Sequence, residues 1–166
     1  MKILITGGMG FIGAHLVNTL SKMHKVTILD NFNENYPGYS KIYRGRVLGV
    51  VDATQLEMSH RQRNVKYRLS LIKDIEILRG WSYELFITKE FDLIINCGSL
   101  AEAILSTHYD EFCYQSIVEG LVSLKERFTC PILHISSSMV YGTWTGAIKE
   151  SDPTNPIDYY GKCKLK

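Results

Sequence analysis

The sequence predicts an α/β fold, a doubly wound parallel sheet with helices on both faces, truncated after a fifth strand and the start of the helix that follows it. Three observations lead to this prediction. Short apolar runs alternate with longer segments of helical period, which is the pattern of βαβ units. A glycine-rich turn joins the first apolar run to the first helical segment, and Asn155-Pro156 marks a turn before a last helix.

Five apolar runs have the length of strands. They are "KILIT" (2–6), "KVTIL" (25–29), "KYRLSLI" (66–72), "DLIIN" (92–96) and "PILHIS" (131–136). Helical period predicts helices over 11–23, 76–88 and 107–128. In the first of these, Ile12, Leu16 and Leu20 recur every four residues, as a helix packed on a sheet requires. Residues 31–65 show no clear period and predict a long, partly irregular crossover.

Composition and charge exclude several classes of protein. A chain of 166 residues with 45% hydrophobic content can bury the core of one domain. Its net charge of +2 argues against a nucleic-acid or membrane partner, and the cation-rich stretch 41–68 fits a solvated face better than a polyanion site. The first apolar run is too short for a signal peptide or a membrane span, so we expect a cytoplasmic protein. Four cysteines without a CxxC pair predict reduced thiols and no metal site.

The glycine-rich turn has the spacing of a dinucleotide site. Its glycines fit two registers, Gly8-x-Gly10-x-x-Gly13 and the triplet Gly7, Gly10 and Gly13. In either register they permit a tight turn and let a pyrophosphate approach the backbone at a helix N-terminus. Glycines also make ordinary turns, but here a strand precedes them and an amphipathic helix follows.

Asp30 ends the second strand, seventeen residues after Gly13. A carboxylate there can accept hydrogen bonds from the adenosine ribose and would repel a 2′-phosphate, so NAD is favoured over NADP. An aspartate is also a common turn residue at the end of a strand.

Six short motifs resemble a known family. In chain order, "TGGMGFIG", "LDNFNENY", "KDIEI", "FDLIINCGSLA", "SSSMVYG" and "YGKCK" are similar to the motifs of the extended short-chain dehydrogenase/reductases, the nucleotide-sugar epimerases and dehydratases. The resemblance covers nearly the whole chain and implies a Rossmann-type fold with NAD as cofactor. It also implies the cofactor residues, which are Gly7, Gly10, Phe11, Ile12 and Gly13 at the pyrophosphate, Asp30 and Asn31 at the adenosine ribose, Asp74 and Ile75 beside the adenine, and Cys97, Gly98 and Ser99 near the nicotinamide ribose.

The resemblance also implies the catalytic residues Ser137, Tyr160 and Lys164. A Tyr-x-x-x-Lys spacing can arise by chance in a chain with ten tyrosines, but here it follows the other motifs in family order. The ammonium of Lys164 is expected to lower the pKa of the Tyr160 phenol, which then takes a proton from a sugar hydroxyl. Ser137 would hold the oxygen of that hydroxyl, although serines after a strand also satisfy loose backbone groups.

The residues after Ser137 favour an epimerase. Related dehydratases and decarboxylases typically carry carboxylates where this chain has Ser138 and Met139. The "DNFNENY" segment resembles uronic-acid nucleotide 4-epimerases, so the expected substrate is a UDP-sugar, and family analogy suggests a homodimer. Two residues depart from the family pattern. Ile117 stands where an Asn is expected, with Ser116 the nearest polar substitute, and Ile104 stands where the uronic-acid enzymes tend to have Arg.

The expected domain organisation is one incomplete NAD-binding domain over 1–166, with the family's C-terminal substrate domain absent from the sequence. Other readings remain open at this point. One alternative is a stand-alone or inactive NAD-binding module. The others are a dehydratase or reductase of the same family, and an incomplete fold that a separate chain or oligomeric partner completes.

Overall fold

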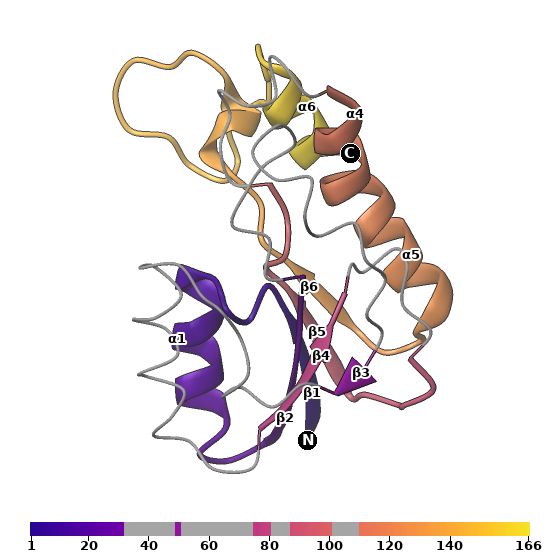
Figure 1. The fold of residues 1–166 in the computed structure, drawn as a ribbon. Helices are drawn as coiled ribbons and strands as arrows, with labels where there is room; N and C mark the ends of the chain where they lie inside the picture. Colours follow the sequence, from indigo (N-terminus) through magenta and orange to yellow (C-terminus); the bar gives the residue numbers. More distant parts are fainter. Residues whose placement is uncertain (32–48, 51–74, 81–86, 101–109) are drawn as a thin grey trace.

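The computed structural model describes residues 1–31, 49–50, 75–80, 87–100 and 110–166 (Figure 1). These residues form a six-stranded sheet in the order β3-β4-β2-β1-β5-β6. The strands are β1 (Lys2–Thr6), β2 (Lys25–Asp30), β3 (Gly49–Val50), β4 (Glu76–Arg79), β5 (Leu93–Asn96) and β6 (Ile132–His134). Five of them are parallel, and only the two-residue β3 runs antiparallel to its neighbour β4.

The helices of the described residues follow the strands as βαβ units require. They are α1 (Phe11–Leu20), α4 (Asp110–Tyr114), a π-helical turn (Gln115–Glu119), α5 (Gly120–Arg127), a 3₁₀ turn (Ser138–Tyr141) and α6 (Tyr159–Leu165). Figure 1 shows α1 on one side of the sheet and α5 on the other. No helix in the part of the chain that is described is long and apolar enough to cross a membrane.

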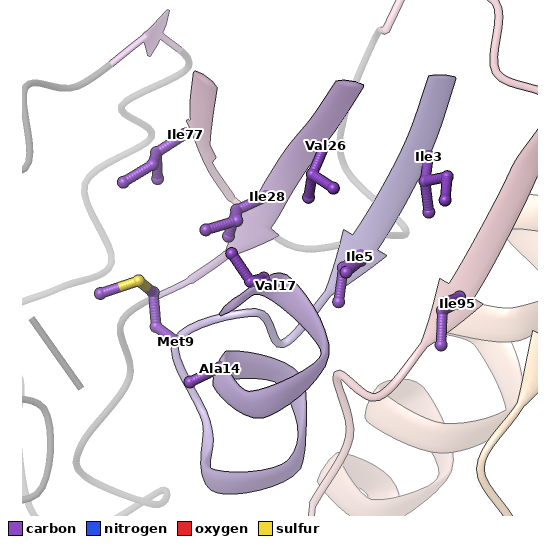
Figure 2. Packing of buried hydrophobic residues seen from close by; sticks show 9 residues of the cluster. All are labelled: Ile3, Ile5, Met9, Ala14, Val17, Val26, Ile28, Ile77 and Ile95. Carbon is purple, nitrogen blue, oxygen red and sulfur yellow. The ribbon is translucent and has the colours of Figure 1, made fainter. Parts of the chain in front are cut away.

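Each central strand buries side chains on both faces of the sheet. Ile3, Ile5 and Ile28 point to the face that α1 covers with Ala14 and Val17 (Figure 2). The alternate residues Leu4, Leu29 and Ile94 point to the opposite face and pack against Leu124 of α5. Strands covered on both faces must be apolar throughout, which explains why they read as continuous runs rather than as alternating patterns. The predicted doubly wound sheet is confirmed.

Two sequence predictions are wrong in detail. The segment 76–88 was expected to be a helix, but its first four residues form β4, parallel to β2, with Ile77 beside Ile28 and Leu78 beside Leu29. A short apolar run can form either a helix or a strand. Here it forms a strand because pairing with β2 lets Ile77 join the apolar cluster on one face of the sheet and Leu78 the cluster on the other. The sheet is also not wholly parallel, since β3 adds an antiparallel edge.

The other elements agree with the sequence to within a few residues. The helix expected over 107–128 is present over 110–127, with the π-helical turn inserted in its middle. The strand expected over 131–136 is shortened to three residues in β6. The strand expected over 66–72 lies outside the described residues, as do Asp74, Ile104 and nearly all of the cation-rich stretch.

Candidate functional site

The site lies at the sheet edge where the parallel strands end. Thr6, Asp30, Asn96 and His134 are the last residues of β1, β2, β5 and β6, and the strand registers place these ends side by side. After β1 the chain enters α1 on one face, whereas the helices that follow β5 cover the other. Such a reversal between neighbouring strands opens the crevice in which ligands of α/β sheets bind.

The glycine turn fits closely against the chain around it. Gly7 has φ +64°, in the left-handed region that favours glycine, and its N–H donates to the carbonyl of Leu29 at 2.7 Å. A Cβ on Gly7 would stand 2.7 Å from the Cα of Gly98, so the turn and the loop after β5 touch through their backbones. Gly13 in α1 has no room for a Cβ either, because the carbonyl of Gly7 lies against it. The turn therefore brings the start of α1, with its free N–H groups, to the crevice.

Phe11 and Ile12 begin α1 with exposed side chains, and 76% of Phe11 is accessible. Asp30 lies against the glycine turn, with Oδ2 accepting the N–H of Met9 at 2.9 Å. Its backbone carbonyl accepts the N–H of Gly80 at 3.0 Å, so Asp30 joins the glycine turn to the end of β4. Asn31 follows it directly and is partly exposed.

One of the predicted residues, Ile75, is not brought to this edge. Ile75 directly precedes β4, so it lies at the amino end of a strand whose carboxyl end meets Asp30. There it packs against the apolar cluster under α1. The prediction that it lies beside an adenine at the crevice is therefore wrong, and Asp74 lies outside the described residues. The residue of this strand that does reach the edge is Gly80, which an apolar run ending in "RG" could have signalled.

A buried polar chain that the sequence did not predict links three strand ends. The N–H of Gly98 donates to Thr6 Oγ1 at 3.0 Å, and Thr6 Oγ1 donates to Asn96 Oδ1 at 2.5 Å. Asn96 Nδ2 lies 3.0 Å from Nδ1 of His134. Because the amide oxygen of Asn96 already accepts from Thr6, its amide nitrogen donates, and Nδ1 of His134 must accept without a proton. The chain thus requires a neutral imidazole.

The pKa of His134 is lowered from 6.5 to about 4, by burial first and by the charge of Lys164 second. The folded protein therefore binds this proton less readily than the unfolded chain does. We expect the contribution of His134 to stability to be complete above about pH 6.5 and to be lost as the pH falls towards about 4. Urea unfolding of the His134→Asn variant between these limits should show a weaker pH dependence than the wild type. The exposed His15→Gln variant is the control, and an unchanged slope for His134→Asn would contradict the assignment.

The three predicted catalytic residues come together at the end of β6. Ser137 caps the 3₁₀ turn, its Oγ accepting the N–H of Met139 at 3.2 Å, and its side chain is hydrogen-bonded to that of Tyr160. Tyr160 and Lys164 share one face of α6, which Asp158 caps by accepting the N–H of Gly161 at 2.6 Å. The Nζ of Lys164 lies 5.9 Å from the centre of the Tyr160 ring.

The ionisation of this group differs from the expectation. Burial raises the pKa of Tyr160 above its ordinary value, and the hydrogen bond to Ser137 lowers it only in part. Burial also lowers the pKa of Lys164 to about 8, against the opposing effect of the neighbouring Cys97 and Cys113 thiols. The expected net lowering of the Tyr160 pKa is therefore not seen, because burial is the largest effect on the phenol and outweighs the hydrogen bond to Ser137.

Cys97, Gly98 and Ser99 follow β5, as predicted, between the glycine turn and α6. Burial raises the pKa of the Cys97 thiol to about 11, so it remains protonated at neutral pH. Gly98 is fixed by its close approach to Gly7. Ser99 accepts a hydrogen bond from Lys164 at 2.8 Å, a contact between a predicted cofactor residue and a predicted catalytic one.

The family model named "NAD dependent epimerase/dehydratase family" matches residues 3–166. The chain belongs to this family. Among curated relatives, a UDP-glucose 4-epimerase of Cyamopsis tetragonoloba is 32% identical over 98% of this chain and 44% of its own length. A UDP-N-acetyl-alpha-D-glucosaminuronate decarboxylase of Bacillus cytotoxicus is 27% identical over 91% of this chain and 41% of its own.

Solved structures share the fold of this family member. The UDP-glucuronic acid 4-epimerase of Bacillus cereus, solved with UDP-glucuronic acid and NAD, has a TM-score of 0.72 at 24% identity and covers 99% of this chain. The UDP-Glc/GlcNAc 4-epimerase of Campylobacter jejuni has a TM-score of 0.72 at 22% identity, again over 99% of this chain. The chain covers 49% and 46% of these two structures, and less than half the length of the curated relatives above.

Proposed function

We propose that residues 1–166 are the NAD-binding part of a nucleotide-sugar epimerase and carry its catalytic Ser137, Tyr160 and Lys164. One observation carries the proposal. The glycine turn, Asp30 and the Ser137–Tyr160–Lys164 group, which are far apart in the sequence, lie along one edge of one sheet. The substrate domain of such an enzyme would be supplied by residues outside this sequence.

The residues at the edge fit NAD. The left-handed Gly7 and the absence of a side chain at Gly10 let a pyrophosphate reach the first N–H groups of α1. Asp30 would meet the adenosine ribose, and its negative charge disfavours a 2′-phosphate. Lys164 and the loop after β5 would hold the nicotinamide ribose. When bound, NAD supplies the group that accepts a hydride from the sugar and returns it.

The protein's own residues would handle the proton of the sugar hydroxyl. Ser137, hydrogen-bonded to Tyr160, is placed to hold the oxygen of that hydroxyl together with the phenol. The phenol must lose its proton before it can act as a base, and its raised pKa opposes this step. The neighbouring ammonium of Lys164 stabilises the phenolate once it forms, since opposite charges attract strongly at a buried site.

Two neighbouring residues support an epimerase over a dehydratase or a decarboxylase. Ser138 and Met139 lie in the 3₁₀ turn beside Tyr160. Related dehydratases and decarboxylases typically carry carboxylate side chains at these positions. Met139 packs partly buried against the cluster around Tyr160 and offers no acid or base. The names of the relatives make a UDP-sugar the substrate to test first.

Calorimetric titration of the purified chain tests the cofactor half of the proposal. We expect NAD to bind more tightly than NADP, and Asp30→Asn to weaken NAD binding and reduce that preference. The matched control is Asp92→Asn, an exposed aspartate at the opposite end of the sheet, where it accepts the N–H of Lys2. A folded chain that binds neither nucleotide would overturn the proposal.

The reaction itself requires the complete protein. If the coding sequence continues into a sugar-binding half, that protein should interconvert UDP-sugar epimers, as judged by product analysis over UDP-, GDP- and CDP-sugars. NAD binding without conversion of any sugar would instead favour a binding module.

A further inference from the structure

Lys164 is a buried amine held by residues from other elements. Its side chain is 8% exposed, and its Nζ donates to Ser99 Oγ at 2.8 Å and to the carbonyl of Ile135 at 3.0 Å. Within the ranges that the structure describes, no carboxylate lies in salt-bridge contact with this ammonium. Two neutral oxygens therefore replace the water that burial removes, and each of them matters because an unpaired buried charge is costly.

Ser99 is itself fixed by hydrogen bonds on both sides. The N–H of Gly98 donates to Thr6 Oγ1 at 3.0 Å, and the N–H of Leu100 donates to Ser116 Oγ at 3.2 Å. Ser116 is buried in the π-helical turn, and its hydroxyl donates to the carbonyl of Cys113 at 3.4 Å. The hydroxyls of Thr6 and Ser116, from separate elements, thus fix the position of the loop that carries Ser99. The contact between Ser99 and Lys164 is therefore preorganised.

The π-helical turn that contacts α6 contributes an apolar residue, Ile117, to the cluster around Tyr160. Ile117 is 2% exposed and packs in one cluster with Leu100, Cys113, Tyr160 and Cys163. Its side chain supports the Tyr160 helix but cannot accept or donate a hydrogen bond. The hydroxyl that accepts a hydrogen bond from Lys164 therefore belongs to Ser99, in the loop after β5, and not to the π-helical turn.

We propose that Ser99 is a positioning residue for Lys164: its hydroxyl, together with the Ile135 carbonyl, holds the ammonium charged and in place beside Tyr160. This inference rests on the proposed function in one respect, which is that Lys164 is a catalytic residue. It adds to the cofactor contact expected for Ser99, and it gives the buried Ser116 a role in holding the loop.

The test is a titration of Lys164 in the 166-residue chain, followed through the NMR signal of its ε-carbon, with Lys164→Arg used to assign that signal. In the wild type the midpoint should lie near the pKa of about 8. In Ser99→Ala we expect it to fall by about one pH unit, because a hydrogen bond to a charged group is lost. Ser99→Thr should restore the midpoint. Ser136→Ala, which removes an exposed hydroxyl directly after Ile135, should leave it unchanged.

The groups that face Lys164 titrate outside this window. Cys97 after β5 has a pKa of about 11, Cys113 of α4 about 12 and His134 of β6 about 4, and the pKa of Tyr160 of α6 is raised above its ordinary 10. A change near pH 8 therefore reports on Lys164 itself. A role of Ser99 limited to packing would not move this midpoint.

An unchanged midpoint in Ser99→Ala, or a midpoint that threonine does not restore, would overturn the inference. Circular dichroism establishes that each variant is folded, and Ser99→Gly removes the same hydroxyl if the alanine variant does not fold. NAD titration of the same samples separates the two proposals. If the wild type binds no NAD, the proposed function fails while the lysine titration still decides the role of Ser99.

Discussion

Gly13→Ala is expected to abolish measurable NAD binding and to destabilise the fold by about 3 kcal/mol, the upper end of the range for overpacking. In an ordinary helix the same change would stabilise by roughly 1 kcal/mol, so the sign of the effect is diagnostic. At Gly13 the added Cβ would collide with the carbonyl oxygen of Gly7 and lie 2.8 Å from both the carbonyl carbon of Gly7 and the Cα of Gly8. These are backbone atoms, so the clash cannot be relieved by rotating a side chain.

Urea unfolding and NAD titration of the same variant measure both effects. Gly10→Ala is the matched control for stability, because its Cβ would meet only the Gly7 oxygen, at 3.2 Å, in a backbone conformation open to any residue. It should cost much less stability than Gly13→Ala. A Gly13→Ala protein as stable as the wild type would show that the close packing of α1 on the turn is not what holds the glycine at this position.

Tyr160→Phe in the complete enzyme is expected to lower turnover by about 10²- to 10⁴-fold, the usual contribution of a positioned acid or base. The substitution removes the phenolic oxygen and its hydrogen bond to Ser137 but keeps the ring that packs among Cys113, Ile117 and Cys163. Stability should therefore change by only about 1 kcal/mol, and NAD affinity should stay close to that of the wild type.

The neighbouring Tyr159→Phe variant is the control for Tyr160→Phe. Tyr159 begins the same helix and packs against the same cluster, but its hydroxyl is hydrogen-bonded to the Cys163 thiol and not to Ser137. Turnover should survive this change. Normal turnover in Tyr160→Phe would remove Tyr160 from the role of base, whatever the result for Tyr159.

Strong local signals in the sequence determined much of the fold. The run "ILITGGMGFIG" combines a buried strand, obligatory glycines and a helix start, and all three form where predicted because each follows from the backbone freedom or burial of neighbouring residues. The spacing of Tyr160 and Lys164 likewise predicts one helix face, and Asp158 caps that helix. The motif order also predicted that Asp30, the loop after β5 and Ser137 belong to one site.

Features that depend on residues distant in the chain could not be predicted from local patterns. The segment after Ile75 became a strand because β2 offered it a pairing edge between two apolar layers, and this moved Ile75 away from the crevice. The raised pKa of Tyr160 is a balance between burial and nearby groups that no spacing encodes. The hydrogen bonds between Thr6 and Asn96, between Asn96 and His134, and between Lys164 and Ser99 join residues 38 to 90 positions apart, and only folding brings such partners within reach.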